Sequence, residues 1–112
     1  MARISKTNQG ILLGDQRTDQ VLLLQDLNGD GDSQDVGEIT VFFDETNASG
    51  LTEPTGNVFA VHQASDKSVY VGDGNTDTVY RLVDSDEDGD ANDAGEAQIW
   101  FSGANAEGLT LP

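Results

Sequence analysis

The sequence predicts an all-β fold built from two copies of one four-stranded antiparallel unit. When the sequence is shifted by 58 residues it overlays itself, and 20 of 41 positions are identical between 14–54 and 72–112. Short β-prone runs rich in Val, Ile, Leu and Phe alternate with turns rich in Gly, Asn and Asp. No apolar periodicity of 3.6 residues is long enough to support a helix. Repeats of this length are usually stacked supersecondary units that bury their faces against one another.

Each copy is expected to contribute four strands, taken here in chain order. In the first copy the strands are predicted at 2–5, 11–13, 20–25 and 39–43. In the second copy they are predicted at 58–62, 68–71, 78–83 and 97–101. The last strand alternates, which predicts Ala97, Ile99 and Phe101 on one face with Gln98 and Trp100 on the other. We therefore divide the chain into repeats 1–54 and 55–112, which together form one structural unit.

Composition excludes several classes of function. The chain has 112 residues, 21 acids against five bases, a formal charge of −16 and no cysteine. The absence of cysteine excludes a disulfide scaffold and a cysteine nucleophile. The negative charge would repel phosphate, so we expect neither nucleic acid nor a membrane as a partner. The charge is concentrated: residues 26–38 and 84–96 hold 12 of the 21 acids and no base.

Four antiparallel strands per repeat of this length are typical of a β-propeller blade. The motif Val-x-Asp followed by Val-x-x-hydrophobic occurs at Val71, Asp73, Val79 and Leu82, and again, with Leu at its first position, at Leu13, Asp15, Val21 and Leu24. It resembles the hairpin between the second and third strands of NHL-type and regucalcin-like propellers. The resemblance implies two blades in this chain.

Two blades cannot close a ring, which needs about four to eight. We therefore expect the chain to associate with itself as a cyclic homo-oligomer, either a trimer with six blades, which we favour, or a tetramer with eight. Two-bladed bacterial lectins that close as trimers resemble this arrangement. The alternatives are a fragment of a longer propeller and a monomeric two-layer β-sandwich.

The two acidic segments read as calcium loops. Both fit D-x-[DN]-x-D-G, in which oxygens at positions 1, 3 and 5 converge on a hard cation and glycine at position 6 makes a sharp turn. The flanks are strands rather than helices, and the loops resemble those of integrin-type propellers and, more loosely, dockerins. The candidate ligands for about two Ca²⁺ per chain are Asp26, Asn28, Asp30, Asp32, Asp35, Glu38, Asp84, Asp86, Asp88, Asp90, Asp93 and Glu96.

Two details of these loops stay open. Either Asp35 with Asp93 or Glu38 with Glu96 must complete the coordination shell. Asn28 stands where the second loop has Asp86, so the first site has one carboxylate fewer and is expected to bind Ca²⁺ more weakly. We expect the ions to be structural and constantly bound, which fits millimolar extracellular calcium. This favours an extracellular or periplasmic location, although residues 1–5 do not begin a signal peptide.

Three kinds of function fit these features. The first is a structural or binding module with a glycan or protein ligand, and a lectin made of two-bladed subunits is one form of it. The second is a calcium-dependent hydrolase of the regucalcin or phytase kind, and the third is a dockerin-like interaction module. Catalysis is not favoured, because the chain has one histidine and no Ser nucleophile motif. His62 could line a channel and Trp100 could stack on a sugar, but both residue types more often pack.

Overall fold

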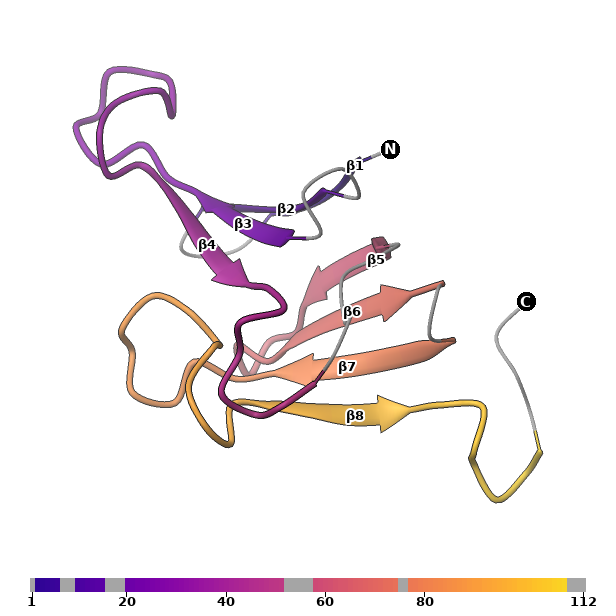
Figure 1. Ribbon diagram of the computed structural model, residues 1–112. Helices are drawn as coiled ribbons and strands as arrows, with labels where there is room; N and C mark the ends of the chain where they lie inside the picture. Colours follow the sequence, from indigo (N-terminus) through magenta and orange to yellow (C-terminus); the bar gives the residue numbers. More distant parts are fainter. Residues whose placement is uncertain (1, 7–9, 16–19, 52–57, 75–76, 109–112) are drawn as a thin grey trace.

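The fold is all-β, with two antiparallel four-stranded sheets that follow one another along the chain (Figure 1). The computed structural model describes residues 2–6, 10–15, 20–51, 58–74 and 77–108, with the side chains of 2–6 and 58–59 outside the description. The first sheet has the order β1(Ala2–Lys6), β2(Ile11–Asp15), β3(Gln20–Leu24), β4(Ile39–Phe43). The second has the order β5(Val58–Gln63), β6(Val69–Asp73), β7(Thr78–Leu82), β8(Ala97–Phe101). No helix occurs among these residues, so the all-β prediction is confirmed.

The strands lie where alternating and continuous apolar runs predicted them, and each sheet is a simple meander. Within the first sheet Leu12 pairs with Leu23, and Leu13 pairs with Leu22. The second sheet repeats this register, with Tyr70 opposite Arg81 and Val71 opposite Tyr80. Neighbouring residues of a strand point to opposite faces of the sheet, and residues that pair across two strands point to the same face. The register therefore tells which residues share a face.

A β-bulge interrupts the outermost strand of each sheet at the same place. Val79 pairs with Phe101 but Tyr80 pairs with Ile99, so Trp100 is an extra residue in β8. The predicted alternation over 97–101 is confirmed for Ala97, Gln98 and Ile99 and is wrong for Phe101, because the bulge moves Phe101 to the face opposite Ala97 and Ile99. In β4 the same shift makes Phe42 the extra residue, with Val21 opposite Phe43 and Leu22 opposite Val41.

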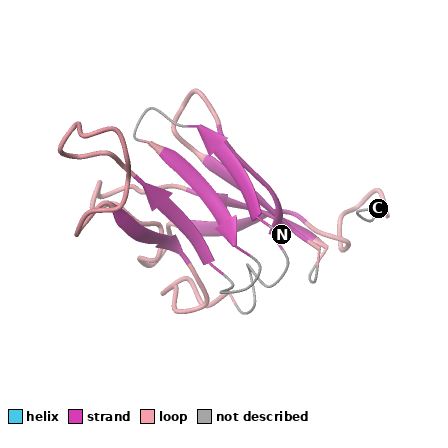
Figure 2. Cartoon of the chain, turned by 90° about the horizontal axis from the view of Figure 1, so that it is seen from above, coloured by secondary structure: helices cyan, strands magenta, loops and turns pink. Residues whose placement is uncertain are grey.

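The two sheets pack against each other and form the core between them (Figure 2). β5 lies against β1 and β2, which brings the two first strands side by side. The first sheet packs with the face that carries Leu12 and Leu23, and the second sheet packs with the face that carries Val71 and Tyr80. Together the two sheets and the second acidic loop supply the buried apolar side chains Leu12, Val21, Leu23, Phe42, Phe43, Val61, Val69, Val71, Tyr80, Leu82, Ala91 and Ala97.

Two long loops, residues 26–38 and 84–96, join the third and fourth strands of their sheets and extend from the same end of the molecule (Figure 1). We call them the first and second acidic loops. Each is closed at its base by a main-chain hydrogen bond that continues the strand ladder. Gln25 donates to the carbonyl of Glu38 (2.8 Å), and Val83 donates to the carbonyl of Glu96 (2.8 Å).

Candidate metal centre

Each acidic loop turns back on itself at the sixth position of its motif. Gly31 has φ 97° and Gly89 has φ 98°, which L side chains rarely adopt. An added Cβ at either glycine would meet nothing within 4 Å, so the requirement is conformational rather than steric. The glycines thus make the sharp turn that lets the flanking oxygens face one centre.

The aspartate at position 1 organises the start of each loop through main-chain amides. Asp26 accepts hydrogen bonds from the N–H groups of Gly29 (2.8 Å), Asp30 (3.2 Å) and Gly31 (2.9 Å). Asp84 accepts from Asp88 (3.1 Å) and Gly89 (2.9 Å). These bonds hold the loop in its curled shape by satisfying donors that would otherwise face water.

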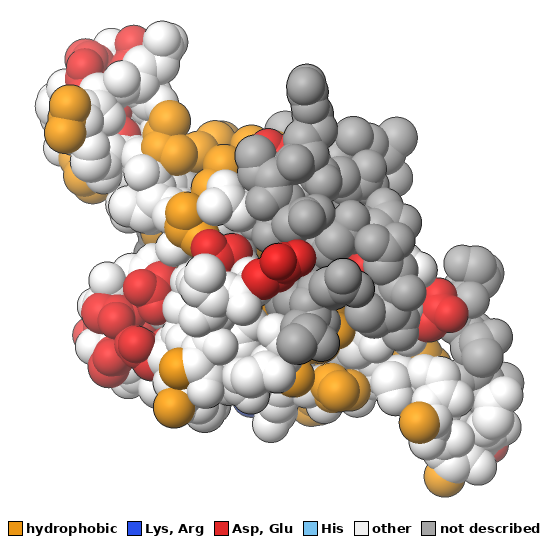
Figure 3. All heavy atoms as spheres, viewed as in Figure 1, with side chains coloured by type: hydrophobic (Ala, Val, Ile, Leu, Met, Phe, Trp, Pro, Cys, Tyr) orange, Lys and Arg blue, Asp and Glu red, His pale blue; other side chains and the backbone are white. Residues whose placement is uncertain are grey.

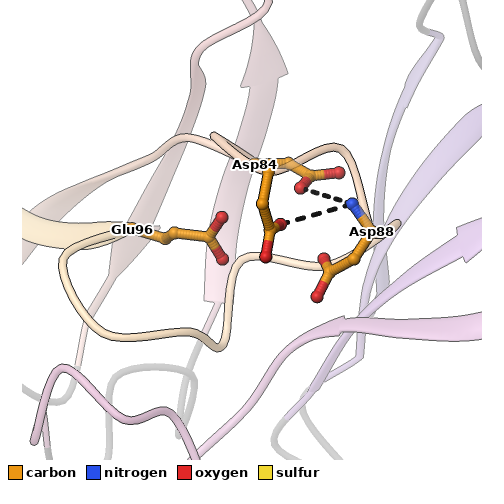
Figure 4. A group of neighbouring side chains, drawn as sticks. Asp84, Asp88 and Glu96 are labelled. Carbon is orange, nitrogen blue, oxygen red and sulfur yellow. Dashed lines mark hydrogen bonds between the residues drawn. The ribbon is translucent and has the colours of Figure 1, made fainter.

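The loops bring carboxylates together that are well separated in sequence. In the first loop, oxygens of Asp30, Asp32 and Asp35 lie within 4.8 Å of one another. In the second loop two overlapping groups meet this spacing, Asp84, Asp86, Asp88 and Glu96 in one, and Asp88, Asp90, Asp93 and Glu96 in the other. Figure 4 shows the carboxylates of Asp84, Asp88 and Glu96 pointing toward one another. Figure 3 shows acidic side chains gathered on both loops.

Glu38 and Glu96 differ from the other carboxylates because they are buried, with 1% and 3% of their surface exposed. The oxygens of Glu38 accept from the N–H groups of Leu27 (2.8 Å) and Asp35 (3.1 Å). Those of Glu96 accept from the N–H groups of Ser85 (2.8 Å) and Asp93 (3.1 Å). Each glutamate therefore ties the start of its loop to the end.

Asp35 and Asp93 contact other side chains of the acidic loops. The Asn28 amide donates to Asp35 (2.6 Å), so positions 3 and 10 of the first loop are in contact. In the second loop, hydrogen bonding with Asp88 and Asp86 raises the pKa of Asp93 to about 7, and the same contact with Asp93 lowers the pKa of Asp88. Near neutral pH a proton is thus shared among oxygens that a divalent cation would otherwise hold together.

Further shifts have other causes. Partial burial raises the pKa of Asp84. The main-chain N–H of Asp32 lowers the pKa of Asp30. Burial of the Asp84 carboxylate therefore disfavours its charged form, a cost that a bound cation would offset.

Neither residue considered for ligand binding lies in the acidic loops. His62 is on β5, opposite Tyr70, and is exposed. Trp100 is 59% exposed, and its ring meets that of Tyr70 edge to face, with 5.5 Å between centroids. Asn92 is a further residue of the second loop: its side chain accepts from the N–H of Asp44 (3.1 Å) and joins the loop to the first repeat. No pattern marks it, because its counterpart in the repeat is Gln34.

The chain matches no protein-family model, no curated protein and no solved structure. Among the described residues there is also no helix that is long and apolar enough to cross a membrane.

Proposed function

We propose that this chain is a calcium-binding β-propeller repeat protein in which each acidic loop holds one structural Ca²⁺. The observation that carries the proposal is the convergence of carboxylates within 4.8 Å in both loops, three in the first loop and groups of four in the second, with three positions of the repeat shared between them. Oxygen ligands on a flexible loop suit Ca²⁺ better than Mg²⁺, which demands a near-ideal octahedron and keeps several waters. Two ions would change the formal charge of −16 to −12 and relieve repulsion where it is most concentrated.

The two sheets support the propeller part of the proposal. Each is a four-stranded antiparallel meander, and the first strands β1 and β5 lie side by side, as blades do around a common axis. Two blades leave the ring open, so we propose that three copies, or alternatively four, complete it. In this arrangement the calcium ions hold the long connections between the third and fourth strands.

Calcium titration by calorimetry tests the metal sites. We expect two Ca²⁺ per wild-type chain and a higher melting temperature with calcium than with chelator. The Asp88→Asn variant should weaken one of the two sites by at least about tenfold, which corresponds to about 1.4 kcal/mol. Glu87→Gln is the matched control: it removes the same charge from an exposed residue of the same loop that belongs to neither acidic group. Absence of calcium binding, or equal loss in both variants, would contradict the proposal.

A further inference from the structure

We propose that copies of this chain associate head to tail, with the free face of the second sheet packing on the free face of the first sheet of the next copy. The inference specifies the contact that the proposed ring requires, and rests on that proposed architecture. The contact between the two sheets inside one chain serves as its template, because the two sheets are copies of one repeat.

Inside the chain, each sheet buries one face in this contact. The first sheet uses Leu12, Val21, Leu23 and Phe43, which are at most 3% exposed. The second sheet uses Val69, Val71, Tyr80 and Leu82, which are also at most 3% exposed. By register, these two sets lie on opposite faces of the repeat, so among the described residues the other face of each sheet, here called its free face, takes no part in this contact.

Most residues of the two free faces are apolar. When the sequence is shifted by 58 residues, most positions of each free face fall on positions that are buried in the other sheet. On the second sheet the free face carries Tyr70, Val79, Arg81, Gln98 and Phe101, and the bulged Trp100 meets Tyr70 on the same side. On the first sheet it carries Ile11, Leu13, Leu22, Leu24, Ile39 and Val41, with the polar Asp15 and Gln20 at one end. Ile11 is 41% and Ile39 is 52% exposed, whereas their counterparts Val69 and Ala97 are 0% and 7% exposed. A second copy that repeated the internal contact would cover both faces.

The clearest contrast is between the two bulge residues. Phe42 is 3% exposed because the second sheet covers it, while Trp100 at the equivalent position is 59% exposed. The edge-to-face contact with Tyr70 already holds the Trp100 ring against its own sheet. Large aromatic side chains that are fixed in this way are the usual anchors of protein contacts.

The same contact would support the first acidic loop. Residues 42–49, which we call the bracing segment, hold the second acidic loop by hydrogen bonds. Ala91 donates to the carbonyl of Phe42 (2.7 Å), and Ala48 donates to the carbonyl of Asn92 (2.6 Å). Both bonds join main-chain atoms, so the sequence differences between the repeats do not prevent them.

In the second repeat the counterpart of the bracing segment is residues 100–107. This segment lies at the opposite end of the molecule from the first acidic loop (Figure 1). In the proposed contact, Ser33 of one copy would donate to the carbonyl of Trp100 of its neighbour, and Ala106 of the neighbour would donate to the carbonyl of Gln34. Ser33 is half-buried in the single chain, whereas its counterpart Ala91 is 0% exposed.

Charge favours a second copy of this chain as the occupant. A groove of about 430 Å³ separates the first sheet from the second acidic loop, and its lining includes Leu23, Asp84, Asp88 and Asp90. The counterpart of Leu23 is Arg81, one of five basic residues in the chain. In the proposed contact Arg81, which lies 3.7 Å from Asp66 and donates to Ser68 in its own chain, also faces the first acidic loop of the next copy, where carboxylates are in excess.

Light scattering with calcium tests the contact. Wild-type protein is expected to have the mass of three or four chains, and Trp100→Glu the mass of one. Ile99→Glu is the matched control, because Ile99 is the adjacent residue, is 55% exposed and lies on the opposite face of β8. It should assemble like the wild type. A monomeric wild type, or assembly unaffected by Trp100→Glu, would overturn the inference.

Mixing two defective variants makes the test independent of misfolding. Trp100→Glu alters the second sheet only and Ile39→Glu alters the first sheet only, so each protein keeps one working face. If the contact is head to tail, the equimolar mixture forms pairs of two chains, although each variant alone is monomeric. A mixture that stays monomeric would contradict the proposal, as would a variant that pairs with itself.

Fluorescence separates this inference from the calcium proposal, because Trp100 is the only tryptophan in the chain. Its emission should shift to the blue and become protected from acrylamide when wild-type chains assemble. A ring in which Trp100 stays accessible would contradict the contact and favour the lectin reading. If Trp100→Glu is monomeric but still binds calcium in its second loop, the contact is supported; if the wild type assembles without binding calcium, only the metal proposal fails.

Discussion

Single residues in the acidic loops have different tasks although they are chemically alike. Glu38 and Glu96 are buried and accept main-chain N–H groups from both ends of their loops. Asp35 and Asp93 instead meet other acidic or amide side chains near the loop centre. The glutamates therefore tie the ends of their loops together, and Glu96 also belongs to both acidic groups of the second loop, so Glu96 and Asp93 can each offer an oxygen to a cation there. A motif cannot separate these tasks, because they depend on which donors the folded backbone presents.

Asp66 gives a prediction for pH dependence outside the acidic loops. Its carboxylate accepts from the N–H of Ser68 (2.9 Å), which lowers its pKa, and Arg81 lies 3.7 Å away. Because the folded-state pKa is depressed, this contribution to stability is present at neutral pH and is lost as the pH falls through the folded-state value. Asp66→Asn should therefore lower the melting temperature at about pH 6, and the difference from wild type should vanish at about pH 2.

The control for Asp66→Asn is Glu45→Gln, which removes the same charge from another exposed residue. The Glu45→Gln variant measures how much the melting temperature changes when one negative charge is removed from a strongly acidic chain. A difference between Asp66→Asn and wild type that is equal at both pH values would contradict the assigned hydrogen bond.

At the scale of elements, the loops and strands depend on a few conformational requirements. Gly89→Ala tests the requirement for a positive φ at the turn of the second acidic loop. The φ of Gly89 is 98°, and no atom would obstruct the new Cβ. We expect the free energy of unfolding to fall by about 1–2 kcal/mol, the usual cost of a positive φ for an L residue. Urea denaturation in the presence of chelator measures this cost without calcium. Gly103→Ala is the control, because Gly103 is not among the glycines with positive φ; an equal cost in both would contradict the argument.

The positions of the strands and of the acidic loops could be predicted from the sequence because both depend on local patterns. Alternating apolar residues and turn-forming residues specify a strand, and aspartates two residues apart specify a loop that can surround an ion. The bulge at Trp100 could not be predicted, since a bulge depends on the register with a partner strand. The role of Asn92 was also invisible, because it contacts Asp44, which is 48 positions earlier.

At the scale of the whole molecule, the same leucine has different surroundings in the two repeats. Leu82 is fully buried between the sheets, whereas its counterpart Leu24 is half-buried on the free face of the first sheet. In the monomer, Leu82→Ala should cost about 2–5 kcal/mol and Leu24→Ala clearly less. Denaturation of dilute protein in chelator measures this difference. If assembly covers Leu24 as proposed, the difference should narrow in the assembled protein. Equal costs in the monomer would contradict the asymmetric packing.

Both acidic loops extend from the same end of the molecule. Because these loops hold 12 of the 21 acids and no base, the centres of positive and negative charge do not coincide. The chain is therefore an electric dipole directed along its strands, and every cation bound in a loop reduces it. Its orientation in a field, or on a positively charged surface, consequently depends on how many loops are occupied.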